Sequence, residues 1–160
     1  MAYIYISVGS NEQKELKIRA ARKALTEVFG ELQVSNVFES ESVGFVGESF
    51  YNLVIGACTE LSPKQVDQIL KKIEQQNGRI RGGKKFSNRI IDLDLLLYDN
   101  VISTANPQIP RQEIIENAFV LQPLSEIAPN LKHPQLQQTY LQLWQNYSKP
   151  QVLKSIEFNW

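Results

Sequence analysis

The stretch Arg89-Ile-Ile-Asp92-Leu-Asp94-Leu-Leu-Leu-Tyr98 decides how this chain folds, because it joins an apolar run to two aspartates spaced by one residue. The run is typical of a strand, which we expect at residues 90–98. Successive side chains of a strand alternate between its faces, so Asp92 and Asp94 share one face with Cα atoms roughly 6–7 Å apart. Adjacent carboxylates resist burial unless a cation compensates them. The pattern therefore predicts that Asp92 and Asp94 bind magnesium.

A basic stretch precedes this strand and suits a polyphosphate ligand. Five cations and no acidic residue lie between positions 79 and 89, namely Arg79, Arg81, Lys84, Lys85 and Arg89. Guanidinium groups bind phosphate through two parallel hydrogen bonds. Magnesium completes its coordination with phosphate oxygens, and two such ions can clamp both sides of a transferring phosphorus. The succession of cations and carboxylates predicts phosphoryl chemistry.

Each feature also has an ordinary structural explanation. A basic loop is most often a solvated surface, and an Asp-x-Asp pair can cap a turn or line a polar sheet face. Their immediate succession on an apolar strand favours the metal and phosphate interpretation.

Length and composition predict one domain, residues 1–160, with a sizeable core. Hydrophobic residues make up 42% of the chain, and 17 Lys and Arg balance 17 Asp and Glu, which disfavours a nucleic-acid partner. Cys58 is the only cysteine, which excludes an intramolecular disulfide and fits a reducing cytoplasm. We find no signal segment and no apolar run near the roughly 18 residues of a membrane span. We expect a cytoplasmic monomer without a membrane partner.

Strands and helices alternate along the chain. We expect strands at residues 2–8, 32–38, 51–59 and 90–98, and helices at residues 16–29, closed by Gly30, and from Pro63 to Gly78, with Ser62 as N-cap. We further expect an edge strand and loop at 101–109, a helix at 113–126 and one or two helical turns near 136–144. The order strand, helix, strand, strand, helix, strand is that of a ferredoxin-like α+β sandwich, an antiparallel sheet with helices on one face.

Familiar nucleotide-binding signatures are missing. The chain has no Gly-x-x-x-x-Gly-Lys-Ser/Thr loop, no Gly-x-Gly-x-x-Gly and no protein-kinase catalytic loop, so an ATP site must be built in another way. His133 is the only histidine and precedes Pro134. We interpret it as part of a structural turn, which excludes a Ser-His-Asp triad and a His-rich metal site.

Several motifs together resemble one enzyme family. They are Gly9-Ser10-Asn11, Phe50-Tyr51-Asn52, Glu74 with Gly78-Arg79-Ile80-Arg81, Arg89-Ile90-Ile91-Asp92-Leu93-Asp94 and Phe119-Val120-Leu121-Gln122-Pro123-Leu124. This set resembles the 6-hydroxymethyl-7,8-dihydropterin pyrophosphokinases of folate biosynthesis over nearly the whole chain. The resemblance implies a ferredoxin-like fold, ATP as co-substrate, two magnesium ions, and transfer of pyrophosphate to the pterin hydroxymethyl group with release of AMP.

The resemblance also implies roles for individual residues. Asp92 and Asp94 would hold both metal ions, and Arg79 and Arg89 would act as catalytic cations. The implied ATP contacts are Glu74, Arg79, Arg81, Arg89, Leu95 and Arg111. The implied pterin contacts are Ser40, Val43, Gly44, Phe50, Asn52, Phe86 and Phe119.

The chain departs from the family pattern after Ile109-Pro110. Where the family carries a histidine and then an arginine that touch ATP, this chain has Arg111 and Asn117. Arg111 can still bind phosphate but cannot titrate near neutrality, and Asn117 brings no charge.

Two functions other than an enzyme are also compatible with parts of the sequence. The first is a non-catalytic paralogue that binds pterin or nucleotide, against which the retained Asp92, Asp94, Arg79 and Arg89 argue. The second is a small RNA-binding α+β module, which the balanced charge disfavours.

Overall fold

A computed structural model describes residues 1–40, 49–77, 91–149, 151 and 153–160. The strands of this part of the chain are β1 (Ala2–Ser10), β2 (Leu32–Val34), β3 (Val37–Ser40), β4 (Phe50–Thr59), β5 (Asp92–Tyr98) and β6 (Leu153–Ile156). They form one antiparallel sheet in the order β5-β1-β4-β3-β6, and β2 pairs with β4. This arrangement confirms the predicted antiparallel α+β sandwich.

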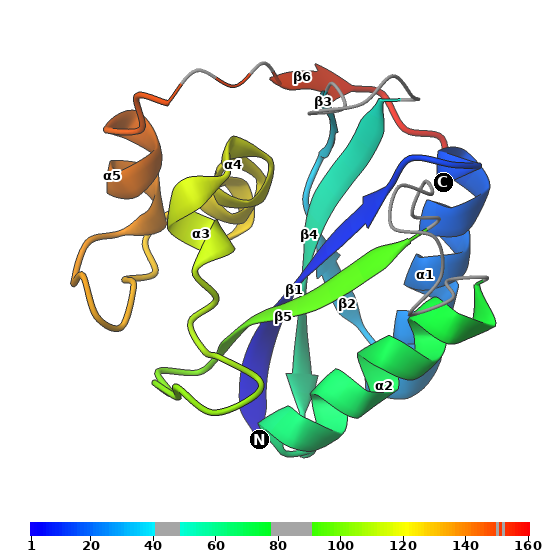
Figure 1. The fold of residues 1–160 in the computed structure, drawn as a ribbon, viewed down its shortest axis with the longest axis horizontal. Helices are drawn as coiled ribbons and strands as arrows, with labels where there is room; N and C mark the ends of the chain where they lie inside the picture. Colours follow the sequence, from blue (N-terminus) through cyan, green and yellow to red (C-terminus); the bar gives the residue numbers. More distant parts are fainter. Residues whose placement is uncertain (41–48, 78–90, 150, 152) are drawn as a thin grey trace.

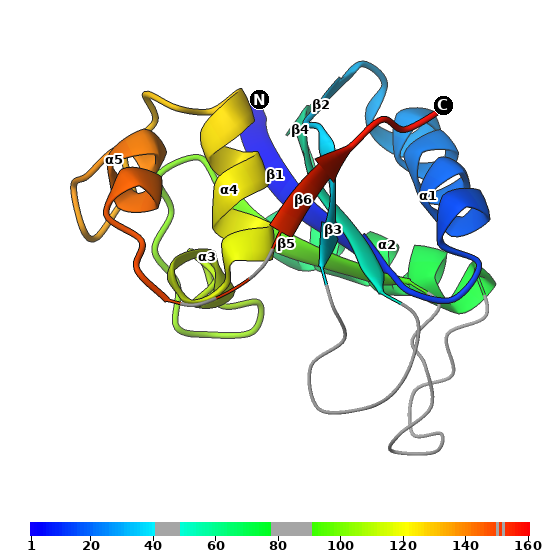
Figure 2. The same ribbon diagram turned by 90° about the horizontal axis from the view of Figure 1, so that it is seen from above.

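Helices cover both faces of the sheet. Those of the described chain are α1 (Lys14–Phe29), α2 (Pro63–Gln76), α3 (Glu113–Glu116), α4 (Ala118–Ile127) and α5 (Tyr140–Gln145). Figures 1 and 2 show α1 and α2 on one side of the sheet and α3, α4 and α5 on the other. The two helices of the predicted ferredoxin-like unit, α1 and α2, thus lie on one face as expected, and the C-terminal helices cover the other face. None of the helices that the described residues form is long and apolar enough to cross a membrane.

The alternation of apolar side chains along the strands creates two separate cores. Ile4 and Ile6 of β1 pack on the side of α1 and α2, with Leu25 and Leu70 among their neighbours. Tyr5 belongs to the second cluster, which comprises Val54, Leu96, Leu97, Ile114, Val120, Leu121, Leu124, Ala128 and Tyr140. Because this second face is apolar over much of its length, it needs its own helical cover, which explains the two-sided architecture.

The predicted ends of the first two helices are largely confirmed. The Ser62 hydroxyl accepts a hydrogen bond from the Gln65 amide at 3.2 Å, the Gln65 side chain accepts one from the Ser62 amide at 2.9 Å, and Pro63 follows. These bonds satisfy amides that the first helical turn leaves unpaired. Gly30 ends α1 with a φ of 78°, a conformation that favours glycine. Gly78, the expected end of α2, lies outside the described residues.

Tertiary contacts divide two elements that were predicted as continuous. The strand expected at 32–38 is two strands, because Ser35 exchanges hydrogen bonds with Val54, its amide donating to the Val54 carbonyl and its hydroxyl accepting from the Val54 amide. The helix expected at 113–126 breaks at Asn117, whose backbone is extended. The edge strand expected at 101–109 is reduced to one bridge between Ser103 and Ile109. Strand β6 was not predicted, since its sequence has little apolar alternation.

His133 has the structural role that its sequence context predicts. Its Nδ1 accepts hydrogen bonds from the amides of Gln135 and Leu136, each at 3.2 Å, and its ring meets the edge of Tyr140. The side chain is buried, and burial lowers the pKa of His133 from its usual 6.5. A protonated Nδ1 cannot accept hydrogen bonds, so the turn requires the neutral ring.

The stability of the protein should therefore fall between pH 7.5 and pH 5.5. The pKa of His133 is lower in the folded than in the unfolded state, so the unfolded chain binds more protons below pH 6.5. The stabilisation is complete above that value and is lost as the pH falls through the folded pKa. Urea unfolding at several pH values measures this slope. His133→Asn, whose side chain accepts without titrating, should flatten it, and an equal slope in both proteins would contradict the assignment.

Candidate active site

The two aspartates of β5 lie on one face of the sheet, as the alternation predicts. Asp92 pairs with Gly9 and Asp94 with Ser7 of β1, while Leu93 and Leu95 are buried in the core on the opposite face. Both aspartates are half-buried, so their carboxylates are held by the strand but remain open to a ligand. The register shifts near Tyr5, beyond this pair.

A buried amide lies two strands away from Asp92 in the same row of the sheet. Asn52 of β4 is only 7% exposed, and its Nδ2 donates to the Ser40 hydroxyl at 3.1 Å. Asn52 and Asp92 both pair with Gly9, from its two sides. Neighbouring strands are about 4.8 Å apart, so the two side chains stand roughly 10 Å from one another across β1. The fold thereby unites a predicted pterin contact with a predicted metal ligand.

Gly9 is required by this close approach. A Cβ atom at position 9 would lie 2.9 Å from Asn52 Oδ1, closer than packed atoms tolerate. The glycine thus gives the Asn52 amide its place over β1. The sequence signal for this role of Gly9 is a glycine at the end of a strand, which often marks such an approach.

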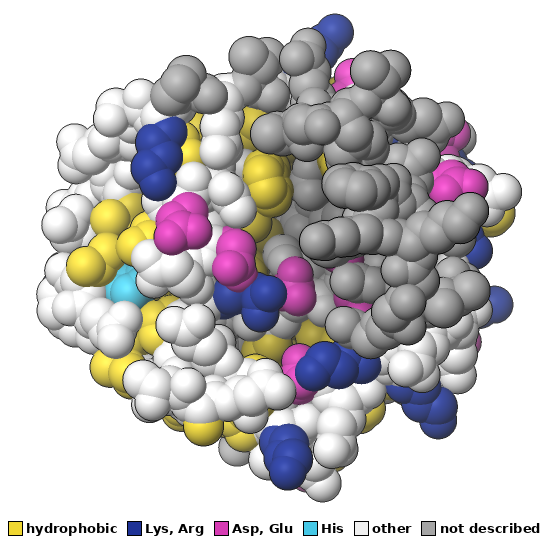
Figure 3. Space-filling model, in the orientation of Figure 1, with side chains coloured by type: hydrophobic (Ala, Val, Ile, Leu, Met, Phe, Trp, Pro, Cys, Tyr) yellow, Lys and Arg dark blue, Asp and Glu magenta, His cyan; other side chains and the backbone are white. Residues whose placement is uncertain are grey.

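Arg111, in the segment before α3, lies beside β5, the strand that carries Asp92 and Asp94. Its Nη2 is 3.5 Å from Asp94 Oδ1, its Nε forms an ion pair with the Glu113 carboxylate, and its amide donates to the Leu96 carbonyl at 3.0 Å. A permanent cation therefore lies beside Asp94. Glu113 was not among the predicted site residues. Figure 3 shows acidic and basic side chains gathered near the middle of this side of the molecule.

Glu74 supports β5 from the opposite face of the sheet. It is fully buried in α2, and its Oε2 accepts a hydrogen bond of 2.8 Å from the Leu93 amide. Because β5 is an edge strand, amides on its open side have no strand partner, and the carboxylate supplies an acceptor to one of them. This contact holds the segment that carries the aspartates. A contact between Glu74 and a nucleotide stays a prediction.

The remaining predicted contacts of the described chain are two phenylalanines and Leu95. Phe50 begins β4 opposite Ser40, and Phe119 lies in α4 against the second core, both half-buried. Leu95 as a whole residue is only 2% exposed and belongs to the core cluster, so its contact with a nucleotide stays a prediction. The carbonyl of Asn117 accepts amide bonds at the start of α4.

Other predicted site residues lie outside the described ones. They are Val43, Gly44, Arg79, Arg81, Phe86 and Arg89. Among the residues that the structure describes, no three His, Cys, Asp or Glu side chains form a metal-binding group. Two carboxylates with room for phosphate oxygens nevertheless fit the way proteins bind magnesium.

Known proteins resemble this chain in sequence and in fold. The family model described as 7,8-dihydro-6-hydroxymethylpterin-pyrophosphokinase (HPPK) matches residues 5–129. The 2-amino-4-hydroxy-6-hydroxymethyldihydropteridine pyrophosphokinase of Aquifex aeolicus is 36% identical over 137 residues, which cover 84% of this chain and 85% of that protein. The folic acid synthesis protein fol1 of Pneumocystis carinii is 35% identical over 82% of this chain but only 18% of its own length.

A solved structure shares the fold at low identity. The HPPK-DHPS triple mutant of Plasmodium falciparum, solved with STZ-DHP, superposes with a TM-score of 0.73 at 14% identity, over 91% of this chain and 43% of that one. At this identity the likeness concerns the fold alone.

Replacing Glu74 should weaken the attachment of β5. Glu74→Ala leaves the buried Leu93 amide without its acceptor and opens a cavity, which should lower the free energy of unfolding by about 2–4 kcal/mol in urea titrations. Glu74→Gln keeps a side-chain oxygen and should lose less than half as much. A change below about 0.5 kcal/mol in Glu74→Ala would mean that the carboxylate does not hold the strand.

Proposed function

Since the chain belongs to the 7,8-dihydro-6-hydroxymethylpterin-pyrophosphokinase family, we propose that the reaction of this family takes place where Asn52, Gly9 and Asp92 lie side by side. The protein is an ATP-dependent diphosphotransferase of folate biosynthesis. It transfers pyrophosphate from ATP to the hydroxymethyl group of 6-hydroxymethyl-7,8-dihydropterin and releases AMP. The observation that carries this location is the row itself, in which the buried Asn52 amide and the Asp92 carboxylate flank one glycine.

Asp92 and Asp94 are the residues that would hold magnesium, with two ions per site. Their common face and partial exposure let them share a cation with phosphate oxygens, and Arg111 lies beside Asp94. Bound magnesium supplies positive charge and orients the triphosphate. The carboxylates would fix the position of that charge, because β5 is held by β1 on one side and by Glu74 on the other.

Positioning and charge neutralisation dominate this kind of chemistry. The substrate hydroxyl attacks the β-phosphorus of ATP, the bond to the α–β bridging oxygen breaks, and negative charge grows on that oxygen and on the transferred group. Arg111 is a cation of the described chain beside the metal strand. From the sequence, Arg79 and Arg89 are the catalytic cations and Arg81 assists them. Leu95 is the further nucleotide contact that the sequence predicts, and Glu74, which is buried, serves the nucleotide site by holding β5.

Asn52 is the proposed anchor of the pterin ring. Its carboxamide can donate and accept, and its bond to Ser40 fixes the amide orientation, so that Oδ1 lies over Gly9. A flat ring with hydrogen-bonding edges suits such a group between aromatic side chains, a role we propose for Phe50 and Phe119. Val43, Gly44 and Phe86 complete the proposed pterin site from the sequence alone.

The protein's setting is also part of the proposal. Cys58 is exposed and free, which suits the reducing cytoplasm. We propose a monomer, and the balance of 17 Lys and Arg against 17 Asp and Glu argues against a nucleic-acid partner.

Removing one metal carboxylate should abolish turnover without unfolding the protein. Asp94→Ala should lower the rate of pterin-dependent AMP formation by on the order of 10³-fold or more, because the charge-neutralising cations lose their ligand. Asp92→Ala should behave alike. Asp67→Ala, which removes a carboxylate paired with Lys71 on α2, is the matched control and should keep its rate. A near-normal rate in Asp94→Ala, with an unchanged magnesium dependence, would take this residue out of the metal site.

Arg111 should serve ATP more than the pterin. Arg111→Ala should raise the KM for ATP by about tenfold and change the KM for the pterin less than twofold, because the lost group is a phosphate-binding fork. Arg111→Lys keeps the charge without the fork, so its KM for ATP should lie between those of the unaltered protein and Arg111→Ala. Steady-state kinetics with each substrate varied in turn measures this, and a selective rise in the pterin KM would reassign the residue.

A further inference from the structure

The last residues of the chain cross from β3 to α1. Figure 2 shows β6 beside β3 and the following residues beside α1. The family match ends at residue 129, so this segment lies beyond the matched part of the chain. We call residues 153–160 the tail.

The tail begins by completing the sheet next to the pterin side of the site. Ser40 pairs with Leu153, Glu39 with Lys154, and Val37 with Ile156. Strand β3 has only four residues, and on its other side it pairs with β4 from Phe38 to Ser40. Without β6 its outer edge would have no strand partner. The tail therefore determines how firmly Ser40 is held.

Aromatic contacts attach the tail to the neighbourhood of Asn52. Ile156 and Phe158 pack against the core on the side of α1 and α2. The ring of Phe158 meets the ring of Tyr51, the residue before Asn52, edge-on at 6.2 Å between centroids. The Lys14 ammonium lies 4.8 Å from the Tyr51 centroid. The ring of Tyr51 is thus held by contacts from both α1 and the tail.

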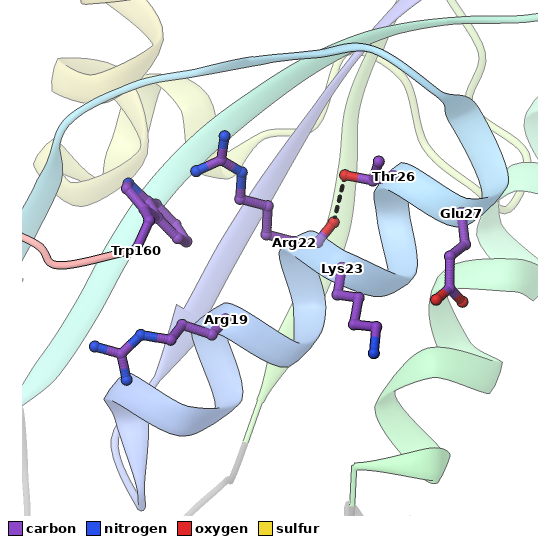
Figure 4. A pocket seen from close by; sticks show the side chains of 6 residues that line it. All are labelled: Arg19, Arg22, Lys23, Thr26, Glu27 and Trp160. Carbon is purple, nitrogen blue, oxygen red and sulfur yellow. Dashed lines mark hydrogen bonds between the residues drawn. The ribbon is translucent and has the colours of Figure 1, made fainter.

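Two arginines of α1 fasten the end of the tail. Arg19 donates to the Asn159 carbonyl from Nε at 2.8 Å and from Nη2 at 2.6 Å, and its guanidinium lies 5.2 Å from the Phe158 centroid. Arg22 lies 4.6 Å from the centroid of Trp160. Figure 4 shows Arg22 and Trp160 on the same side of α1. Guanidinium groups stack well on aromatic rings, so both arginines are matched to the tail.

The hollow in Figure 4 is the seam between the tail and α1. It has a volume of about 310 Å³ and is lined by Arg19, Arg22, Lys23, Thr26, Glu27 and Trp160. Arg19 and Arg22 are already engaged by the tail, and Glu27 adds a negative charge. These features fit a joint within the protein better than an anion site.

We propose that the tail is a clamp that positions Ser40 and Asn52 for pterin binding, an inference that rests on the proposed pterin site. The clamp acts through β6 on β3, whose Ser40 accepts the Asn52 hydrogen bond, and through Phe158 on Tyr51. Phe158 and Arg19 are positioning residues, since they lie on the far side of the sheet from the aspartates.

The test loosens the clamp from its outer end. Phe158→Ala and Arg19→Ala should each raise the KM for the pterin by about fivefold, with kcat and the KM for ATP changed less than twofold. Phe158→Tyr keeps the ring and should restore the pterin KM. Lys23→Ala removes a cation of the same hollow that makes no ring contact, and it should behave as the unaltered protein.

A second readout does not depend on activity. Amide hydrogen exchange of residues 37–40 should be faster in Phe158→Ala and Arg19→Ala than in the unaltered chain and in Lys23→Ala, while exchange in β5 stays unchanged. Thermal unfolding confirms that each variant is folded at the assay temperature.

The outcomes separate the clamp from the proposed function. Faster exchange in β3 with an unchanged pterin KM would overturn the clamp and leave the tail a purely structural element, and so would unchanged exchange. If the unaltered protein forms no pterin-dependent AMP, the proposed function fails. The clamp is then decided by exchange together with pterin binding in calorimetry, where an unchanged pterin Kd in Phe158→Ala would overturn it.

Discussion

The pairing of β1 with both β4 and β5 is the constraint on which the rest of this structure depends. It fixes Gly9 between Asn52 and Asp92, so that a hydrogen-bonding amide and a carboxylate proposed to bind metal face the same side at a separation set by strand spacing. Strand pairing is rigid over such a distance, whereas loops are not. A transfer reaction that must align two substrates gains from this, because orientation contributes much of the rate.

The charges around β5 are arranged in two layers. On the site face, Arg111 lies between Asp94 and Glu113 and forms an ion pair with each. On the opposite face, Glu74 uses its buried charge to accept an amide of the strand. The contacts of Arg111 are half-exposed, whereas the contact of Glu74 is buried in the core. Strand β5 is therefore held on the α2 face by a buried hydrogen bond, while the charged side chains on its other face remain half-exposed.

The two helical layers divide the work of the fold. Helices α1 and α2 cover the face of the sheet that Glu74 supports. Helix α4 covers the apolar half of the face that carries the aspartates. The tail joins α1 to the edge of the sheet, since it pairs with β3 and contacts α1 through Arg19. Helix α1 near one end of the chain and the tail at the other both contact Tyr51 of β4, the strand that carries Asn52.

Local patterns in the sequence were sufficient for the features that depend on neighbouring residues. The common face of Asp92 and Asp94, the Ser62 cap and the turn at His133 follow from strand alternation and short-range hydrogen bonding, and the family motifs identified the chemistry. Tertiary structure alone decided the two-sided helical cover, strand β6, the approach of Asn52 to Gly9 and the contacts of Glu74 and Arg111. Each of these joins residues far apart in the chain, and their energies depend on burial and spatial proximity, which no local periodicity encodes.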